Sequence, residues 1–180
     1  MKSVLISIKP EWCELIASGK KTIEVRKTMP RLETPFKVYI YCTKNGNFMV
    51  RSQNNPAKKT NKIKVYGGKV IGYFTCDSIE CFTTDYRKNE EQTRRMEELS
   101  CVSLVELADY ETNAHCLYGW HISNLMLYTK PKKLSEFKKV PNGANTYRQE
   151  FLGKDFCIKY YSDLKLTRPP QSWCYVEELE

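Results

Sequence analysis

Long apolar runs are missing from this sequence of 180 residues. A membrane-spanning helix needs about 20 consecutive apolar residues, so no membrane span or membrane partner is expected. The N-terminus also lacks a basic segment followed by an apolar stretch and a cleavage site, so we predict no secretion signal and a cytoplasmic location. The chain is 41% hydrophobic, which suffices for one sizeable core. We therefore expect a single domain over residues 1–180.

Paired cysteine motifs are missing as well. The eight cysteines are spaced irregularly and contain no CxxC pair, so in a reducing compartment we expect thiols rather than a disulfide framework. His115, Cys116 and His121 do not have the ligand spacing of a zinc site. We therefore predict no bound metal and no cofactor, and the sequence does not indicate an oligomeric state.

Acidic residues are absent between Glu33 and Asp77, an interval that holds eight cations. The remaining 21 cations equal the 21 acids of the chain, so the whole net charge of +8 belongs to this segment. A concentrated positive field attracts polyanions, and the tyrosines within it can stack on unpaired bases. The alternative is a solvated loop beside ordinary core tyrosines. The candidate contacts to a nucleic-acid backbone are Lys44, Arg51, Lys58, Lys59 and Lys62.

The first 26 residues predict a strand, a short helix and a second strand. Apolar residues alternate over residues 4–8, which is typical of a strand. Pro10 suits the first turn of a helix, and an apolar stripe at i, i+3 and i+4 begins at Trp12. Gly19 suits the left-handed position that ends a helix. The charged strand that follows is therefore expected beside a helix end.

Residues 19–26 hold the most informative cluster of polar side chains. If the two apolar residues of this strand face the core, Thr22, Glu24 and Arg26 share the opposite face, and Lys21 lies at the strand entrance. Together they offer one acceptor and several donors to a small polar ligand. The alternative is an exposed strand face on which Glu24 and Arg26 pair with each other, since such ion pairs are common and weak.

The remaining chain predicts several strands and few helices. Expected strands cover residues 36–42, 62–66, 69–76, 78–82, 118–128 and 172–176. Residues 43–61 are expected to form a basic loop or long hairpin, and Gly72 indicates a bulge or a close backbone approach. Residues 85–99 predict an exposed charged helix or a connector, and Ser103 with Glu106 predicts a capping box. This pattern favours an α+β fold, a small β-barrel decorated by short helices.

The stretch Gly19-Lys20-Lys21-Thr22-Ile23-Glu24-Val25-Arg26 resembles the ASCH family of the PUA-like superfamily, whose hallmark is G-x-K-x-x-E-x-R. All four fixed positions are present. The segments 118–123 and 168–173 are also similar to a bacterial or phage branch of that family. The resemblance covers nearly the whole chain, and residues 43–61 and 85–99 are its least similar parts.

The resemblance implies a PUA-like, small mixed β-barrel of about five or six strands, with a cleft bounded by the first helix. Relatives are proposed to bind RNA or to act on nucleotides. In one branch they are amidohydrolases that remove the acetyl group from N4-acetylcytidine with a lysine, a threonine and a glutamate. Lys21 matches that lysine, whereas Glu24 occupies the threonine position, and the glutamate would come from the region of Glu98 and Glu106.

We therefore expect a module that binds nucleic acid or a nucleotide, with RNA, another nucleic acid or a modified nucleoside as partner. Lys21 and Arg26 would engage a phosphate or a base carbonyl, and Glu24 would accept from an exocyclic amine. Thr22, Trp120 and His121 complete the expected binding set, with Trp120 or a tyrosine stacking on a base.

The first alternative is a hydrolase of a modified nucleoside or of RNA. Its catalytic residues would be Glu24 as general base and Lys21 at the developing oxyanion. His121 is a second acid/base candidate, although a hydrogen-bonded structural histidine beside Trp120 is the favoured interpretation. A module that contacts an acidic protein through the basic loop is a third possibility.

Overall fold

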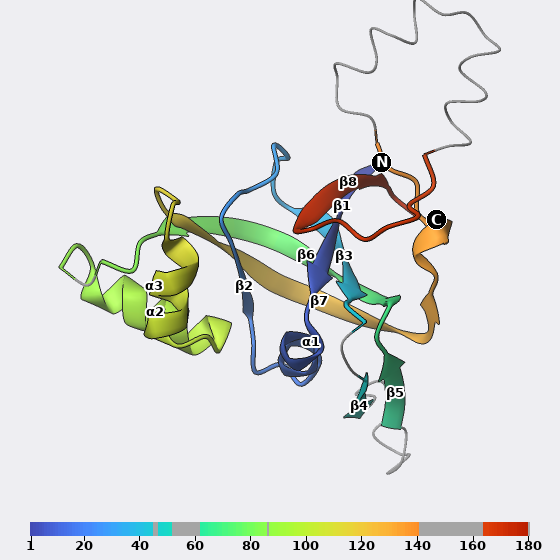
Figure 1. The fold of residues 1–180 in the computed structure, drawn as a ribbon, viewed down its shortest axis with the longest axis horizontal. Coiled ribbons are helices and arrows are strands. Elements are labelled where there is room, and N and C mark those ends of the chain that lie inside the picture. The colour runs from blue at the N-terminus through green and yellow to red at the C-terminus, as the bar shows by residue number, and fades with distance from the viewer. Residues whose placement is uncertain (45–46, 52–61, 86, 141–163, 180) are drawn as a thin grey trace, which may run out of the picture.

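The computed structural model describes residues 1–44, 47–51, 62–85, 87–140 and 164–179. Six strands form one mixed sheet in the order β2-β7-β6-β3-β1-β8 (Figure 1). Their bounds are β1 (Lys2–Ile8), β2 (Ile23–Arg26), β3 (Phe36–Cys42), β6 (Lys69–Phe82), β7 (Leu117–Lys132) and β8 (Trp173–Glu177). Strands β1 and β3 are parallel, and the other neighbours are antiparallel. The α+β class predicted from the sequence is confirmed.

The remaining elements are short. β4 (Asn47–Arg51) and β5 (Lys62–Tyr66) form a separate antiparallel pair. The helices are α1 (Pro10–Ala17), α2 (Glu90–Ser100) and α3 (Leu104–Glu111), with one 3₁₀ turn, η1 (Leu134–Glu136). None of the described helices is long and apolar enough to cross a membrane. Within the predicted basic loop, β4 is described, whereas residues 45–46 and 52–61 lie outside the described part of the chain.

The sheet is not a closed barrel in the described part of the chain, because its end strands β2 and β8 do not pair with each other. The apolar residues of β2 pack against α2 and α3 instead. A side-chain hydrogen bond, and not main-chain strand pairing, connects β2 to β1. Arg26 Nη2 donates to the main-chain oxygen of Ser7 at 2.7 Å. The barrel expectation is therefore correct in its strand count but too strict about closure.

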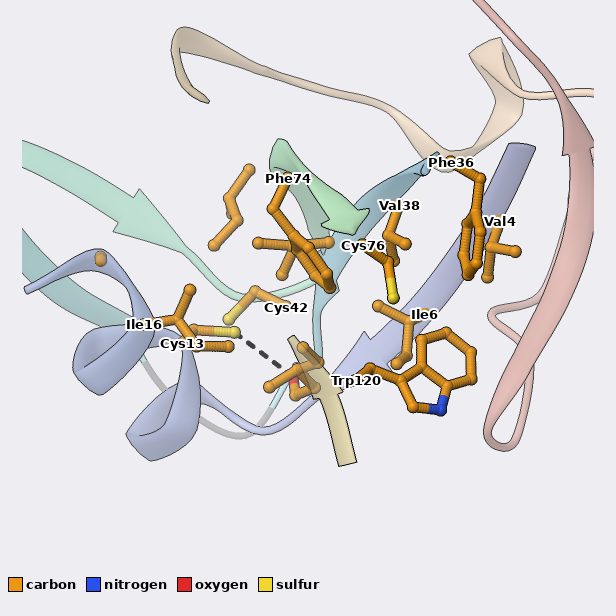
Figure 2. Close-up of a cluster of buried hydrophobic side chains, with 14 residues drawn as sticks. Val4, Ile6, Cys13, Ile16, Phe36, Val38, Cys42, Phe74, Cys76 and Trp120 are labelled. Carbon is orange, nitrogen blue, oxygen red and sulfur yellow. Dashed lines mark hydrogen bonds between the residues drawn. The ribbon is translucent and has the colours of Figure 1, made fainter. Parts of the chain in front are cut away.

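The main core lies between α1 and one face of the sheet. Figure 2 shows apolar side chains from β1, α1, β3 and β6 gathered in one cluster that includes Trp120 of β7. Trp120 is fully buried, and its ring lies 6.1 Å from that of Phe36 and 5.9 Å from that of Trp173, both edge to face. Such aromatic contacts add to the free energy gained by burying apolar area. Trp120 is thus a core residue of this fold.

Helices α2 and α3 form a pair at the β2 end of the sheet (Figure 1). The predicted capping box is confirmed, because Ser103 Oγ accepts from Glu106 N and the Glu106 carboxylate accepts from Ser103 N. The charged region predicted as a helix or a connector contains α2, which begins after Asn89, whose side chain caps Gln92 N. Few apolar residues are needed there because only one face of α2 is buried.

Gly72 lies where β6 approaches β7 most closely. A Cβ atom at this position would lie 2.1 Å from the main-chain oxygen of Met126. The register of β6 against β7 also shifts between Val70 and Gly72. The predicted close backbone approach is therefore confirmed, and glycine is required because any side chain would push the strands apart.

Candidate functional site

Gly19 places the polar cluster beside the end of α1. Its φ of 75° is left-handed, and the main-chain N–H groups of Lys20 and Lys21 both donate to the carbonyl of Leu15. This tight stop returns the chain directly into β2, where Glu24 is aligned with Trp120 of β7. The expected order of strand, helix, glycine stop and charged strand is therefore correct.

Lys21, Glu24 and Arg26 form a buried ion-pair cluster. Arg26 Nη2 lies 2.8 Å from Glu24 Oε1, and Lys21 Nζ lies 3.4 Å from Glu24 Oε2. The three residues are only 2%, 5% and 9% exposed. Glu24 and Arg26 pair as the simpler interpretation predicted, but that interpretation placed them on an exposed strand face, and this is wrong. Segments remote in sequence cover these side chains, because Arg26 contacts Ser7 O and Ser172 Oγ and Lys21 contacts Ser100 O.

Lys21 is held by the C-terminal end of α2. Its Nζ donates to the main-chain oxygen of Ser100 at 2.7 Å. The last carbonyls of a helix have no partner within the helix and carry partial negative charge, so a cation is favoured there. The same Nζ lies 5.4 Å from the ring centroid of Trp12, within the range of a cation–π contact.

Arg26 retains donor capacity toward the site. Its guanidinium has five N–H groups, and besides Glu24 it reaches the main-chain oxygen of Ser7 at 2.7 Å and Ser172 Oγ at 3.5 Å. Its Nε is buried and makes no hydrogen bond within the described structure. A buried N–H without a partner is costly, so the contacts within the protein do not fully satisfy this guanidinium.

The three charged residues line an open cavity of about 510 Å³ between α1, β2 and α3. Its size falls in the range of small-molecule sites. The lining residues are Ser7, Ile8, Lys9, Trp12, Lys21, Glu24, Val25, Arg26, Thr43, Val102, Glu106, Leu107, Tyr110 and Gln171. The exposed Lys9 and Glu106 offset each other, and the buried cluster of two cations and one carboxylate leaves the cavity one positive charge in excess.

Two aromatic rings line this cavity, Trp12 from α1 and Tyr110 from α3. Trp12 is half-buried, whereas Tyr110 is 38% exposed, and Lys27 Nζ lies 5.0 Å from the Tyr110 ring centroid. The sequence analysis assigned Trp12 only to an apolar stripe and did not identify Tyr110 or Gln171. Gln171 lies within the family-like segment 168–173, which was a usable signal. Nothing local distinguishes Tyr110 in the sequence.

Three residues expected at the site do not line the cavity. Thr22 uses its main chain to join β2 to its neighbours, donating to Leu99 O and accepting from Ile122 N, both at 2.9 Å. Trp120 is fully buried in the core and offers no exposed ring face for stacking on a base. His121 lies outside the cavity lining. Alternation along β7 explains this, because His121 points to the opposite face of the sheet from Trp120.

His121 belongs to a surface ion-pair network with Glu80 and Arg95. Its Nε2 contacts one carboxylate oxygen of Glu80, and Arg95 Nη2 contacts the other. Partial burial alone would raise the pKa of Glu80, but the hydrogen bonds from Arg95 and His121 outweigh it and lower that pKa. This arrangement agrees with the structural interpretation of the histidine.

Three of the residues predicted to contact a nucleic-acid backbone, Lys44, Arg51 and Lys62, lie within the described part of the chain. Lys44 is exposed and directly follows Thr43, which lines the cavity. Arg51 and Lys62 are aligned across the β4–β5 pair, and nothing further is described of their side chains. Lys58 and Lys59 lie outside the described residues.

Of the two candidates for the single amidohydrolase glutamate, Glu106 lines the cavity and Glu98 is exposed outside the cavity lining. The Glu106 carboxylate accepts hydrogen bonds from the hydroxyl and the main-chain N–H of Ser103, and these lower its pKa. Capping α3 therefore occupies part of the acceptor capacity of Glu106.

A mixed six-stranded sheet with a charged cavity beside its first helix defines this chain as an α+β protein. Residues 6–152 match the ASCH domain family, and the chain belongs to that family. Among solved structures, the ASCH protein of Zymomonas mobilis is 19% identical, with a TM-score of 0.58 over 98% of this chain and 88% of that one. A mutant form of that protein gives 20% identity and a TM-score of 0.57 over 99% and 92% of the two chains. No curated protein matches the sequence.

Proposed function

We propose that this protein binds single-stranded RNA and takes one unstacked nucleotide into the cavity lined by Lys21, Glu24 and Arg26. The observation that carries this proposal is the buried Arg26 guanidinium, which lines the cavity while its Nε has no partner in the described structure. A group of that kind suits a phosphate oxygen or a base carbonyl. Membership of a PUA-like family associated with RNA supports the same partner.

The charge of the cavity favours an anionic ligand. Burying charged groups costs free energy even when they pair, and replacing such a cluster by apolar residues is often neutral or stabilising. Here two cations share one carboxylate at less than one-tenth exposure. A nucleotide phosphate would offset the extra positive charge. The N-terminus of α1 adds to this field, because Lys9 at the N-cap makes no side-chain cap bond and both Lys9 and Trp12 line the cavity.

A nucleobase matches the remaining features of the cavity. Trp12 and Tyr110 replace Trp120 as the aromatic rings available for stacking. Glu24 accepts one contact on each oxygen, and each carboxylate oxygen has a second lone pair for an exocyclic amine. A single-stranded target follows, because only an unstacked base can enter a cavity of this size.

Fluorescence anisotropy with labelled single-stranded RNA, in competition with cytidine 5′-monophosphate, tests the proposal. The chain offers a matched pair of variants, because Lys21 is buried in the cavity and Lys20 is exposed. Losing a hydrogen bond to a charged group costs about 1.5–3 kcal/mol, so Lys21→Gln should weaken mononucleotide binding about 10- to 100-fold. Lys20→Gln should leave it unchanged. Equal affinities of the two variants, both folded by circular dichroism, would contradict the proposal.

Hydrolysis of a modified nucleoside is the second candidate, because Lys21, Glu24 and Glu106 line one cavity together. Water would add to the acetyl carbon of N4-acetylcytidine, and the bond to the base nitrogen would break to give cytidine and acetate. Glu24 would take a proton from water and return it to the departing base nitrogen, and Lys21 would stabilise the oxyanion. Turnover measured by chromatography should be lost in Glu24→Gln. Turnover that persists in a folded Glu24→Gln protein would exclude Glu24 as the base.

A further inference from the structure

A second group of cations lies outside the basic segment recognised in the sequence. Residues 130–139 hold five lysines and one acid, Glu136, and residues 164–168 add two cations without an acid. Its members are Lys130, Lys132, Lys133, Lys138, Lys139, Lys165 and Arg168. Counting charges over the whole sequence does not reveal this cluster, because the cations outside residues 34–76 are equal in number to the acids of the chain.

Two of these lysines are held opposite each other by the fold. Lys138 and Lys165 form an isolated antiparallel bridge, and both are exposed. The bridge is fixed by Leu166 N, which donates to Phe137 O at 2.9 Å, and both of these apolar residues belong to a buried cluster. Like charges directly opposite each other destabilise a strand pair. The fold therefore holds two positive charges together at a cost that a bound anion would remove.

The cavity is connected to the turn between β5 and β6 by direct contacts. Thr43 lines the cavity, and the exposed Lys44 follows it. The side chain of Lys44 packs over Gly68, where a Cβ atom would lie 3.2 Å from its Cγ. Gly68 N in turn donates to Cys42 O at 2.8 Å. Lys44 is therefore fixed between the cavity and the first residues of β6.

The same contacts continue to the far end of β7. Lys69 is aligned with the last residue of β3, and the next residue, Val70, is aligned with Lys132. Figure 1 shows this end of β7 beside the start of β6 and the β4–β5 pair. The exposed Lys130 and Lys133 flank that position. A row of cations thus runs from the cavity through Lys69 to the end of β7, and the opposed Lys138 and Lys165 continue it beyond η1.

Acidic side chains neutralise little of this row. In the described part of the chain, Glu136 pairs with Lys132 at 3.9 Å. No ion pair between described residues involves the other members, which are Lys44, Lys69, Lys130, Lys133, Lys138 and Lys165. By contrast, most of the arginines of the α2 region pair with a nearby carboxylate. Among the described residues, the row is therefore only partly compensated, by Glu136 at Lys132 and by Glu177, whose main-chain N–H donates to Lys138 O at 2.9 Å.

We propose that this row is a second nucleic-acid surface, which binds the phosphates of RNA nucleotides that follow the one held in the cavity. The proposal rests on the proposed function for the position of that first nucleotide. Lysine is suited to this role because it contacts phosphates as a point charge without reading sequence. The row then determines how affinity depends on RNA length and salt, and the cavity determines which nucleotide is held.

The test compares two double variants that change net charge equally. Lys138→Gln/Lys165→Gln removes the opposed pair, and Lys88→Gln/Arg94→Gln removes two exposed cations near α2. Anisotropy with a 12-nucleotide RNA is measured from 50 to 300 mM salt. Each phosphate contact contributes about 0.7 to the slope of log affinity against log salt, so the first variant should lower that slope by about 1.4. Its affinity at 0.1 M salt should fall about 25-fold, and the α2 variant should match the native protein.

An unchanged slope in Lys138→Gln/Lys165→Gln, or an equal loss in both variants, would overturn the proposal. Because removing like charges should not lower thermal stability, melting curves identify any variant that is misfolded, and Lys130→Gln/Lys133→Gln then serves as the second variant. Cytidine 5′-monophosphate distinguishes the two proposals, since the row variants should bind it normally. Lys21→Gln can leave the affinities for both the RNA and the mononucleotide unchanged while Lys138→Gln/Lys165→Gln still lowers the salt slope. In that case the cavity proposal fails and the second surface stands.

Discussion

Glu24→Gln should destabilise the protein more than any other conservative change in the cavity. Its two oxygens lie 2.8 Å from Arg26 Nη2 and 3.4 Å from Lys21 Nζ, and its side chain is 7% exposed. Removing one partner of a buried ion pair leaves the remaining charge uncompensated, at a cost of about 3–5 kcal/mol. That is a large share of the 5–15 kcal/mol by which domains are typically stable.

For a chain of this length, each kcal/mol shifts the melting temperature by about 2–4 °C, so Glu24→Gln should melt about 6–20 °C below the native protein. Glu14→Gln is the matched control, because Glu14 is exposed on α1, and a surface change of this kind stays within about 0.5 kcal/mol. Urea unfolding measures the free energy of unfolding of each variant, and thermal melts followed by circular dichroism measure its melting temperature.

Added phosphate extends the same prediction. Without Glu24 the buried cluster keeps two cations and no carboxylate, so inorganic phosphate should stabilise Glu24→Gln more than the native protein. A Glu24→Gln protein that melts like Glu14→Gln, with no response to phosphate, would refute the reasoning. It would mean that water already screens the three charges and that the cavity has no unusual affinity for anions.

Three further outcomes are expected. Gly72→Ala should destabilise the protein by about 1–3 kcal/mol in urea unfolding, because its Cβ atom would lie 2.1 Å from a main-chain oxygen of β7; unchanged stability would contradict the close approach. Arg95 and His121 lower the pKa of Glu80, so its contribution to stability is present above the ordinary value of 4.5 and lost as the pH falls below it. The difference in melting temperature between the native protein and Glu80→Gln should therefore shrink from pH 6 to pH 3, and a constant difference would disprove the network's role. Burial raises the pKa of Cys76 to about 12, so mass spectrometry after brief alkylation at pH 8 should find it unlabelled in the folded protein and labelled in urea.

Local patterns predicted the elements around the cavity well. Pro10 and Gly19 bound α1, the capping box of Ser103 starts α3, and Gly72 marks a close strand approach. Each of these signals is a single residue or a group of residues within a few positions of one another. The G-x-K-x-x-E-x-R pattern likewise identified Lys21, Glu24 and Arg26 without any tertiary information.

Burial and side-chain partners could not be predicted in the same way. Lys21 is buried because Ser100, 79 residues away, presents a helix-end carbonyl to it. Trp120 was expected at the ligand and is in the core, because packing against Phe36 and Trp173 requires the sheet order. Tyr110 reaches the cavity only because α3 folds over β2. Contacts between remote elements decide all of these positions.

The most direct test of the central claim is a nuclear magnetic resonance titration of the arginine Nε–H groups with cytidine 5′-monophosphate. Arg26 Nε is buried and makes no hydrogen bond within the described structure, and its signal is identified by its loss in Arg26→Lys. If the cavity holds a nucleotide, this signal should shift downfield and saturate together with mononucleotide binding, while the exposed Arg87 stays unchanged. A signal that does not move while RNA still binds would contradict the assignment of this cavity as the ligand site.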